Sequence, residues 1–289
     1  MALSSDKKVV ILGSNGLLGS TLSEYLSQYY DVLPTAFSSS NENHLRIDIT
    51  NKKEMDNLFK KFTPEYIINC AAYTDVDKAE NNRELAYDIN VNGIKNIISS
   101  SSLNCKIVHI STDYVFDGKK DSYTEEDIPN PLNYYGKIKL ESENVLRGSN
   151  RNHIIFRTSV LFNNTHKCFY SWVLNELREN NKITVVDDQI SNPTWTWSFS
   201  EAIYKSIINN LDGIYHYTGD DILSRFDFAT KIAQLHDFNL NNIIKIKTDD
   251  LQQLAKRPLR TTLKTNKIKE MIDIEHPPVE VVLNTFINN

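Results

Sequence analysis

Hydrophobic and polar positions at the start of the chain predict a strand, a glycine turn and a helix. The run "VVILG" (9–13) is rich in β-branched residues and ends in glycine, which is typical of a buried strand that stops at a turn. Behind it, Leu22, Leu26 and Tyr29 recur at helical spacing among polar residues. A further strand is expected at 31–37, so the chain opens with alternating strand and helix.

The same alternation continues along the chain. Behind a capping Thr50, the residues Met55, Leu58, Phe59 and Phe62 form one apolar stripe of a helix. Later segments alternate likewise, with strands expected at 65–72, 106–112, 153–162, 182–188 and 213–218, and helices at 83–102 and 132–146. This order predicts an α/β fold with a doubly wound parallel sheet that helices cover on both faces.

The alternation of strands and helices ends near residue 220. Helical segments and loops follow, with Pro258, Pro277 and Pro278 among them. We therefore expect residues 1–162, joined by 197–219, to form the main domain. Residues 163–196 and 220–289 are expected to form a smaller substrate-binding region over the carboxyl ends of the strands. At 289 residues the chain is long enough for both parts to share a sizeable core.

Composition narrows the class of protein. The chain has 40% hydrophobic and 24% charged residues and a net charge of -5, without a basic stripe, so we expect no nucleic-acid partner. No apolar run approaches the roughly 18 residues of a membrane span, and the polar N-terminus has no signal-peptide pattern. Cys70, Cys105 and Cys168 lie far apart, so neither a disulfide framework nor a metal site is expected. These features predict a soluble, cytoplasmic protein.

The glycine turn after the first strand has the pattern GxxGxxG. A glycine turn between strand and helix lets the backbone approach a pyrophosphate and directs helix N–H groups at it. The alternative is a tight turn that needs glycine only for its backbone conformation. The position between strand and helix favours dinucleotide binding, with contacts expected from Gly13, Asn15, Gly16, Leu17, Leu18 and Gly19.

The end of the second strand bears on the choice of dinucleotide. An acidic residue there would accept a hydrogen bond from the adenosine ribose of NAD, but this chain has Ser38, Ser39 and Ser40 after Phe37. Hydroxyl groups can donate to a 2′-phosphate, so NADPH is favoured and NADH stays open. A polar loop without a binding role is the alternative for these serines.

The stretch "YYGKIK" (134–139) contains a candidate proton donor. Tyr135 has Lys139 four residues on and shares a helix face with it, whereas Tyr134 has Ile138 there. A Tyr and a Lys at this spacing are expected about once by chance in such a chain, so the pair carries weight only together with other motifs.

Further motifs follow in order from about residue 9 to residue 265: "LGSNGLLGS", "RIDITN", "NCAAYTDVDKAE", "NVNG", "ISTDYVFDG", "YYGKIKLESE", "FRTSVLF", "DDQISNPT", "GIYHYTG" and "KRPLRTTL". Through this series the sequence resembles the extended short-chain dehydrogenase/reductase superfamily and, within it, the dTDP-4-dehydrorhamnose reductases. The resemblance implies a Rossmann fold, NADPH as cofactor and a nucleotide-sugar substrate. A homodimer is the oligomer that we would test first.

The resemblance also implies a catalytic set of Thr112, Tyr135 and Lys139. Reduction of a ketone needs a proton as well as a hydride, and a phenol is a weak acid unless its anion is stabilised. A nearby ammonium group is expected to lower the pKa of the phenol, and the threonine hydroxyl is expected to hold the substrate oxygen. Tyr134 is expected to pack against other residues or to form part of the rim of the site.

Cofactor and substrate contacts are implied in the same way. Asp48 and Ile49 would lie near the adenine, and Ala71, Ala72 and Tyr73 along the cofactor. Asn90 would help to hold the lysine through its backbone or a water. Strand packing is the alternative for the small residues. The substrate contacts implied are Asp113, Tyr114, Gln189, Thr194 and Arg257, and a planar guanidinium suits a diphosphate.

Some positions depart from the pattern of the family. Val160 stands where rhamnose-forming reductases usually carry tryptophan, which leaves the sugar and the nucleotide, dTDP or UDP, open. His166, Lys167 and Cys168 keep a bifunctional 3,5-epimerase/4-reductase open. Tyr114 follows Asp113 where 4,6-dehydratases carry Glu, so dehydration is disfavoured. A non-catalytic NADP-binding regulator, like the subunit of methionine adenosyltransferase, is the alternative from another class.

Overall fold

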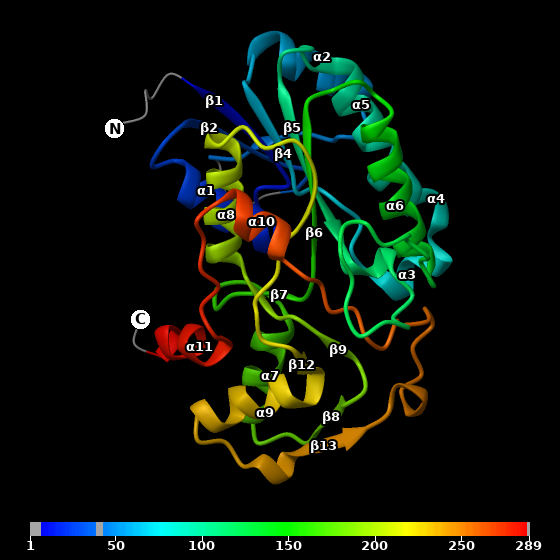
Figure 1. The fold of residues 1–289 in the computed structure, drawn as a ribbon, viewed down its shortest axis with the longest axis vertical. Coiled ribbons are helices and arrows are strands. Elements are labelled where there is room, and N and C mark those ends of the chain that lie inside the picture. The colour runs from blue at the N-terminus through cyan, green and yellow to red at the C-terminus, as the bar shows by residue number, and fades with distance from the viewer. Residues whose placement is uncertain (1–6, 39–42, 288–289) are drawn as a thin grey trace.

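The computed structural model describes residues 7–38 and 43–287, and its centre is a parallel sheet of seven strands (Figure 1). The strand order is β11-β6-β5-β4-β1-β2-β3. The strands are β1 (Lys8–Leu12), β2 (Asp31–Ala36), β3 (Leu45–Arg46), β4 (Tyr66–Asn69), β5 (Lys106–Thr112), β6 (His153–Thr158) and β11 (Gly213–His216). The chain order reverses between β1 and β4, and in sheets of this type ligands bind beyond the carboxyl ends of the strands at that point.

Helices cover both faces of the sheet, as the alternating pattern predicted. On one face α1 (Leu17–Leu26) packs against α8 (Thr196–Ile208) over a core that contains Leu22, Phe156 and Phe199. On the other face α2 (Lys52–Lys61), α5 (Gly93–Ser100) and α6 (Tyr134–Arg147) enclose a second core with Met55, Ile94 and Leu146. The predicted doubly wound α/β fold is therefore confirmed.

The helix expected at 83–102 is interrupted. The chain forms α3 (Val76–Asn81), α4 (Arg83–Tyr87), a π-helical turn at Asp88–Asn92 and then α5. A π-helical turn is rare and often marks a functional site.

Two smaller details of the prediction are corrected. The N-cap of α2 is Asn51, whose side chain accepts from the backbone N–H groups of Lys53 and Glu54, whereas the Thr50 hydroxyl donates to Asp48. The strand expected at 153–162 ends at Thr158, because the chain leaves the main sheet there to form another short pair. In that pair β7 (Leu161–Phe162) lies beside β10 (Thr194–Trp195).

The smaller part of the molecule lies below the sheet in Figure 1. The helices α7 (Phe169–Arg178), α9 (Arg225–Leu235) and α11 (Val279–Ile287) surround a separate hydrophobic core with Val173, Phe228 and Leu283. Two short strand pairs complete it: β8 (Ile183–Val186) with β13 (Ile243–Ile246), and β9 (Ile190–Ser191) with β12 (Leu223–Ser224). This core is distinct from the two that flank the sheet.

One segment of the C-terminal region belongs with the sheet. Helix α10 (Asn266–Met271) places Ile268 in the core under β11, and Ile272 and Ile274 follow it there. The segment 220–287 is thus shared between both parts of the fold, because its apolar residues pack on two different cores.

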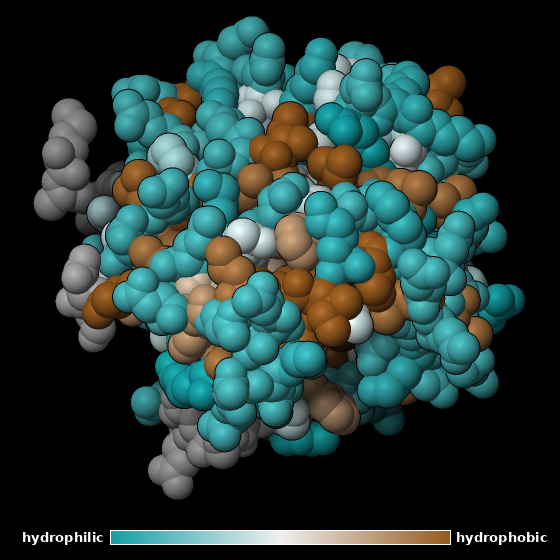
Figure 2. Space-filling view, turned by 90° about the horizontal axis from the view of Figure 1, so that it is seen from below, coloured by the Kyte–Doolittle hydropathy of each residue, from teal (hydrophilic) through white to brown (hydrophobic). Residues whose placement is uncertain are grey.

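The lower face of the molecule is mostly hydrophilic, with hydrophobic patches between the polar residues (Figure 2). Within the described part of the chain, no helix is both long enough and apolar enough to cross a bilayer.

A buried ion pair joins α6 to the sheet. The Nη2 of Arg157 on β6 lies 2.7 Å from Oε2 of Glu143 on α6, and its Nε lies 3.1 Å from Oε1. The Ser111 hydroxyl on β5 donates to the same carboxylate. Glu143 and Arg157 are 0% and 2% exposed. The pair therefore holds the helix across β5, and each charge depends on the other for compensation.

We expect the substitution Arg157→Met to lower the free energy of unfolding by about 3–5 kcal/mol, because it leaves the Glu143 carboxylate buried without its counter-charge. Urea titration followed by circular dichroism measures the change. Asp56→Asn, at the exposed Lys52–Asp56 pair, is the matched control and should leave the free energy of unfolding nearly unchanged. A loss below about 1 kcal/mol for Arg157→Met would show that the pair is not needed.

Candidate active site

A cleft of about 880 Å³ opens at the carboxyl ends of the central strands. The sheet contributes the glycine turn after β1, the segment after β4 and the ends of β5 and β6. The smaller part contributes Gln189, Arg225 and Arg257 from the other side. This is the position that the topology of the sheet favours for a ligand.

The glycine turn shapes the nucleotide end of the cleft. Gly13 has a φ of 79°, and a Cβ at this residue would lie 2.7 Å from the backbone nitrogen of Ala71, so only glycine fits. The backbone N–H groups of Gly13 and Ser14 both donate to the Thr35 carbonyl, which fixes the turn against β2. Helix α1 begins after Gly16 without a side-chain cap, and its first turn lines the cleft. Such a helix N-terminus suits a pyrophosphate.

Only some of the residues expected to contact the cofactor reach this cleft. Its lining includes Gly13, Gly16, Leu17, Leu18, Gly19 and Ala72. Ala71 and Tyr73 lie in the same loop but not in the lining, and Ile49 is buried against Gly93. Asp48 accepts from the backbone and the hydroxyl of Thr50 at 2.9 and 2.8 Å.

The region beyond β2 holds the residues expected to select the cofactor. The Asn15 amide donates to the Ser38 carbonyl, which joins the glycine turn to this region. Ser39 and Ser40 lie outside the described residues. Arg46 was missed by the sequence analysis: the parallel register sets it beside Ala36, and its guanidinium lies 5.5 Å from the Phe37 ring. Arg46 lies ten positions after Ala36 in the sequence, and only the pairing of the short β3 strand with β2 brings them together.

The Asn90 side chain holds the loop after β4. It accepts from the Tyr73 N–H at 2.9 Å and donates to the Tyr73 carbonyl at 3.1 Å. The expected role of Asn90 toward Lys139, through its backbone or a water, stays a prediction. The π-helical turn at Asp88–Asn92 carries this residue.

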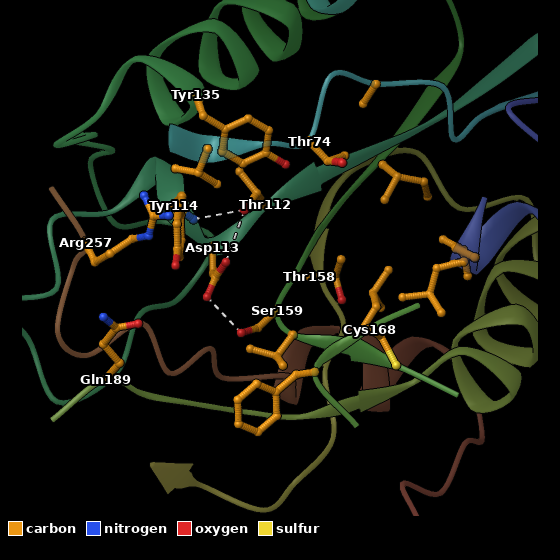
Figure 3. A pocket seen from close by; sticks show the side chains of 18 of the residues that line it. Thr74, Thr112, Asp113, Tyr114, Tyr135, Thr158, Ser159, Cys168, Gln189 and Arg257 are labelled. Carbon is orange, nitrogen blue, oxygen red and sulfur yellow. Dashed lines mark hydrogen bonds between the residues drawn. The ribbon is translucent and has the colours of Figure 1, made fainter. Parts of the chain in front are cut away.

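Thr112, Tyr135 and Lys139 line the cleft together. Thr112 is the last residue of β5, and Tyr135 lies in the first turn of α6, which Asn133 caps by accepting from the Gly136 N–H at 2.8 Å. A Cβ at Gly136 would lie 2.2 Å from the Tyr114 carbonyl oxygen, so glycine allows the helix to approach β5. Figure 3 shows the Tyr135 hydroxyl pointing into the space between Thr112 and Thr74. Tyr134 lies outside the cleft lining, under the Arg83 guanidinium.

The charges in this cleft are strongly affected by burial. Desolvation lowers the pKa of Lys139 to about 8, although Glu143 opposes the shift. Desolvation and the Asp113 carboxylate raise the pKa of Tyr135 above its ordinary value. The lowering of the Tyr135 pKa expected from Lys139 stays a prediction, because burial and Asp113 set the direction here. Tyr135 therefore carries its proton throughout the neutral range, which suits a proton donor.

Asp113 fixes the hydroxyl of Thr112. It is buried and accepts from Thr112 at 3.1 Å, from Ser159 at 2.8 Å and from Thr261. The Thr112 oxygen accepts in turn from the Tyr114 N–H at 3.2 Å (Figure 3). Burial raises the pKa of Asp113, and the three hydroxyl groups oppose this shift. Asp113 thus orients the Thr112 hydroxyl. Tyr114, the next residue, packs edge-on against Tyr135.

Two of the predicted substrate residues in the smaller part reach the cleft. Arg257 forms an ion pair of 2.8 Å with Asp77, which also accepts from the Ala255 N–H at 2.8 Å. Gln189 donates to Thr248 and Gln253. Thr194 does not line the cleft: it is fully buried, and its hydroxyl donates to the Asn192 carbonyl.

Arg225 is a second residue that the sequence analysis missed. It begins α9 directly after Ser224, lines the cleft as Arg257 does and lies 5.2 Å from the Phe169 ring. In the sequence, Ser224 followed three residues later by Asp227 is the pattern of a capping box, which marks the start of a helix. This pattern could have predicted that Arg225 lies at a helix N-terminus.

Of the three residues that left an epimerase activity open, two reach the cleft. Lys167 and Cys168 line the cleft, whereas His166 does not and bonds to Thr165. Cys168 lies on the opposite side of the cleft from Arg257 (Figure 3). Among residues 7–38 and 43–287, no three or more His, Cys, Asp and Glu side chains are grouped to hold a metal ion.

A doubly wound parallel sheet, a glycine turn and a tyrosine with a buried lysine at one cleft define an oxidoreductase of the Rossmann type. The sequence pattern described as RmlD substrate binding domain matches residues 7–289, and the chain belongs to this family.

Individual relatives agree with this placement. The chain is 36% identical to the dTDP-4-dehydrorhamnose reductase of Aggregatibacter actinomycetemcomitans, over 93% of this chain and 94% of that protein. It is 34% identical to a dTDP-4-dehydrorhamnose reductase of Bacillus anthracis str. Ames crystallised in complex with NADP, with a TM-score of 0.91 over 98% and 99% of the two chains. Methionine adenosyltransferase 2 subunit beta of Bos taurus is 26% identical over 92% of this chain and 83% of that protein.

We expect Gly13→Ala to abolish binding of NADPH, because the added Cβ meets the Ala71 backbone in a turn with positive φ. Titration of the cofactor followed by its fluorescence measures the loss. Gly213→Ala is the matched control: Gly213 also has a positive φ, of 98°, but a Cβ there has open space. Unchanged affinity in a folded Gly13→Ala protein would show that the cofactor does not use this turn.

Proposed function

We propose that the protein reduces the C4 ketone of a nucleotide-linked 4-keto-6-deoxyhexose with NADPH, as its relatives named dTDP-4-dehydrorhamnose reductase do. The product would be a nucleotide-linked L-rhamnose. The observation that carries the proposal is the convergence of Thr112, Tyr135 and Lys139 on the cleft that contains the glycine turn. A regulatory subunit would have no need of a proton donor at this position.

The glycine turn and the first turn of α1 would hold the pyrophosphate of the cofactor. Bound there, NADPH would supply the hydride for C4. Tyr135 gives its proton to the carbonyl oxygen, so that an alcohol forms, and the ammonium of Lys139 stabilises the phenolate that is left. To hold the same oxygen, the Thr112 hydroxyl turns its proton from Asp113 to the cleft. Arg46 beside Phe37 supports NADPH over NADH, because a guanidinium suits a 2′-phosphate.

The segments 163–196 and 220–289 supply the substrate side in this proposal. Arg225 and Arg257 face the cleft from two different segments, and their positive charges suit the diphosphate of a nucleotide sugar. Gln189 lies between polar partners at the same end of the cleft. Val160 also lines the cleft, at the position where the family usually carries tryptophan.

Epimerisation of the sugar ring is a second candidate activity at the same site. It is favoured by Lys167 and Cys168, which line the cleft and could move protons next to a keto-sugar. In that case the enzyme would accept a substrate that has not been epimerised beforehand.

Product analysis tests the proposal directly. We expect NADPH to be consumed, one for each alcohol formed, when the protein is mixed with a dTDP- or UDP-linked 4-keto-6-deoxyhexose of the 3,5-epimerised form. NMR of the product identifies the nucleotide and the configuration at C4. Turnover of the form without prior epimerisation would add the second activity. Binding of NADPH without consumption in any of these mixtures would favour the regulatory alternative.

We expect Tyr135→Phe to lower kcat by about 10² to 10⁴, because loss of a positioned acid costs that much, and to leave the affinity for NADPH almost unchanged. Tyr134→Phe is the matched control, since its hydroxyl donates to the Arg83 carbonyl outside the cleft. Steady-state kinetics and cofactor titration measure both. Equal loss in the two variants would overturn the assignment of Tyr135.

A further inference from the structure

A chain of buried polar side chains runs beneath the cleft, from the end of β4 to α6. Asn69, His109 and Ser142 are 3%, 1% and 0% exposed. The Asn69 amide nitrogen lies 3.2 Å from Nδ1 of His109, and Nε2 of His109 lies 2.9 Å from the Ser142 oxygen. None of these three residues belongs to the catalytic set.

The direction of this chain follows from its two ends. The Ala71 N–H donates to Oδ1 of Asn69 at 3.2 Å, so the NH2 group of Asn69 faces His109 and Nδ1 accepts. The Ser142 hydroxyl donates to the Lys139 carbonyl at 2.6 Å, so its oxygen accepts from Nε2. His109 therefore carries its proton on Nε2.

This tautomer matters because of the position of Lys139. Its Nζ donates to the Ile110 carbonyl at 2.7 Å and lies 3.5 Å from Nε2 of His109. A nitrogen that carries a proton cannot accept a hydrogen bond, so His109 offers the ammonium no acceptor on its inner side. One of the three N–H groups is used by Ile110, and the other two are left for the cleft.

We infer that Asn69 and His109 together are a positioning device, which keeps the ammonium group of Lys139 directed at the cofactor and at Tyr135 by denying it an acceptor beneath the cleft. The inference rests on the proposed reductase function. It also explains why polar side chains are buried at this position, where apolar side chains would pack as well.

The charged and titratable groups around Lys139 are consistent with this role. Cys70 faces it from the end of β4, His109 from β5 and Glu143 from α6, and Tyr135 lines the same cleft. Burial and the positive charge of Lys139 lower the pKa of His109 well below its ordinary value, so the imidazole stays neutral and keeps a single N–H.

The tautomer can be observed without any activity. In protein labelled with ¹⁵N-histidine, the nitrogen shifts of His109 should report the neutral Nε2–H form between pH 6 and pH 9, with His109→Gln used to assign the signal. An Nδ1–H tautomer, or an imidazolium in this range, would overturn the inference. This result does not depend on whether the proposed substrate is correct.

The variant Asn69→Asp tests the consequence. A carboxylate accepts from Nδ1–H and so reverses the tautomer, which exposes the Nε2 lone pair to the Lys139 ammonium. We expect kcat to fall about tenfold or more, with KM for the keto-sugar within about twofold of the parent, because the loss concerns the proton donor and not substrate binding. The alkaline limb of kcat/KM should move to higher pH, since the ammonium gains an acceptor.

Two comparisons separate this effect from simpler ones. Asn242→Asp replaces a buried amide that bonds to Asn180, away from the cleft, and should leave the kinetics and the His109 signal unchanged. The double variant Asn69→Asp/His109→Gln keeps the added charge but has no imidazole lone pair. A pH shift and a loss of kcat as large in the double variant as in Asn69→Asp alone would mean that charge is sufficient, and would overturn the inference.

Discussion

The ion pair between Glu143 and Arg157 is the constraint on which the site depends most. Parallel strands bring their carboxyl ends to one edge, but a helix that packs on the sheet can still slide or rotate over it. Here a charge on α6 is compensated by a charge on β6, with Ser111 of β5 between them. Because neither charge can be solvated, the helix has one low-energy position over the strands. Lys139 is one turn away from Glu143, so the same contact sets where its ammonium group lies.

Members of this fold family differ in function, and the fold alone does not separate them. The chain resembles both dTDP-4-dehydrorhamnose reductases and the beta subunit of methionine adenosyltransferase 2 over more than nine tenths of its length. What favours an enzyme is chemistry at the cleft: a protonated phenol, a buried ammonium group and a threonine hydroxyl that a carboxylate orients. The higher identity to the reductases agrees with this.

Much of the fold could be predicted because its signals are local. Strand and helix periods, the glycine turn and the spacing of Tyr135 and Lys139 are all properties of short stretches. The corrections concern contacts between distant segments. Arg46 joins the end of β2 only through strand pairing, and the Asn90 side chain bonds to the backbone of Tyr73 in another loop. Thr194 belongs to one of the motifs, but its side chain is fully buried and its hydroxyl donates to the Asn192 carbonyl, so it does not reach the cleft. Such outcomes depend on tertiary packing, which no window of sequence contains.

The sequence also suggested that Lys139 would lower the pKa of Tyr135. The spacing was right, but the size of the desolvation term depends on how much protein surrounds both groups, which the sequence does not show. The same burial that brings the pair together opposes ionisation of both. The electrostatics of the site are thus a property of the complete fold.

The contact of Asp77 with Arg257 and with the Ala255 N–H has a consequence for how ligands are taken up. It links the loop that carries Arg257 to α3. A guanidinium held in this way has little conformational freedom left, so little is given up when it takes an anion. Folding itself thus sets the position of this wall of the cleft.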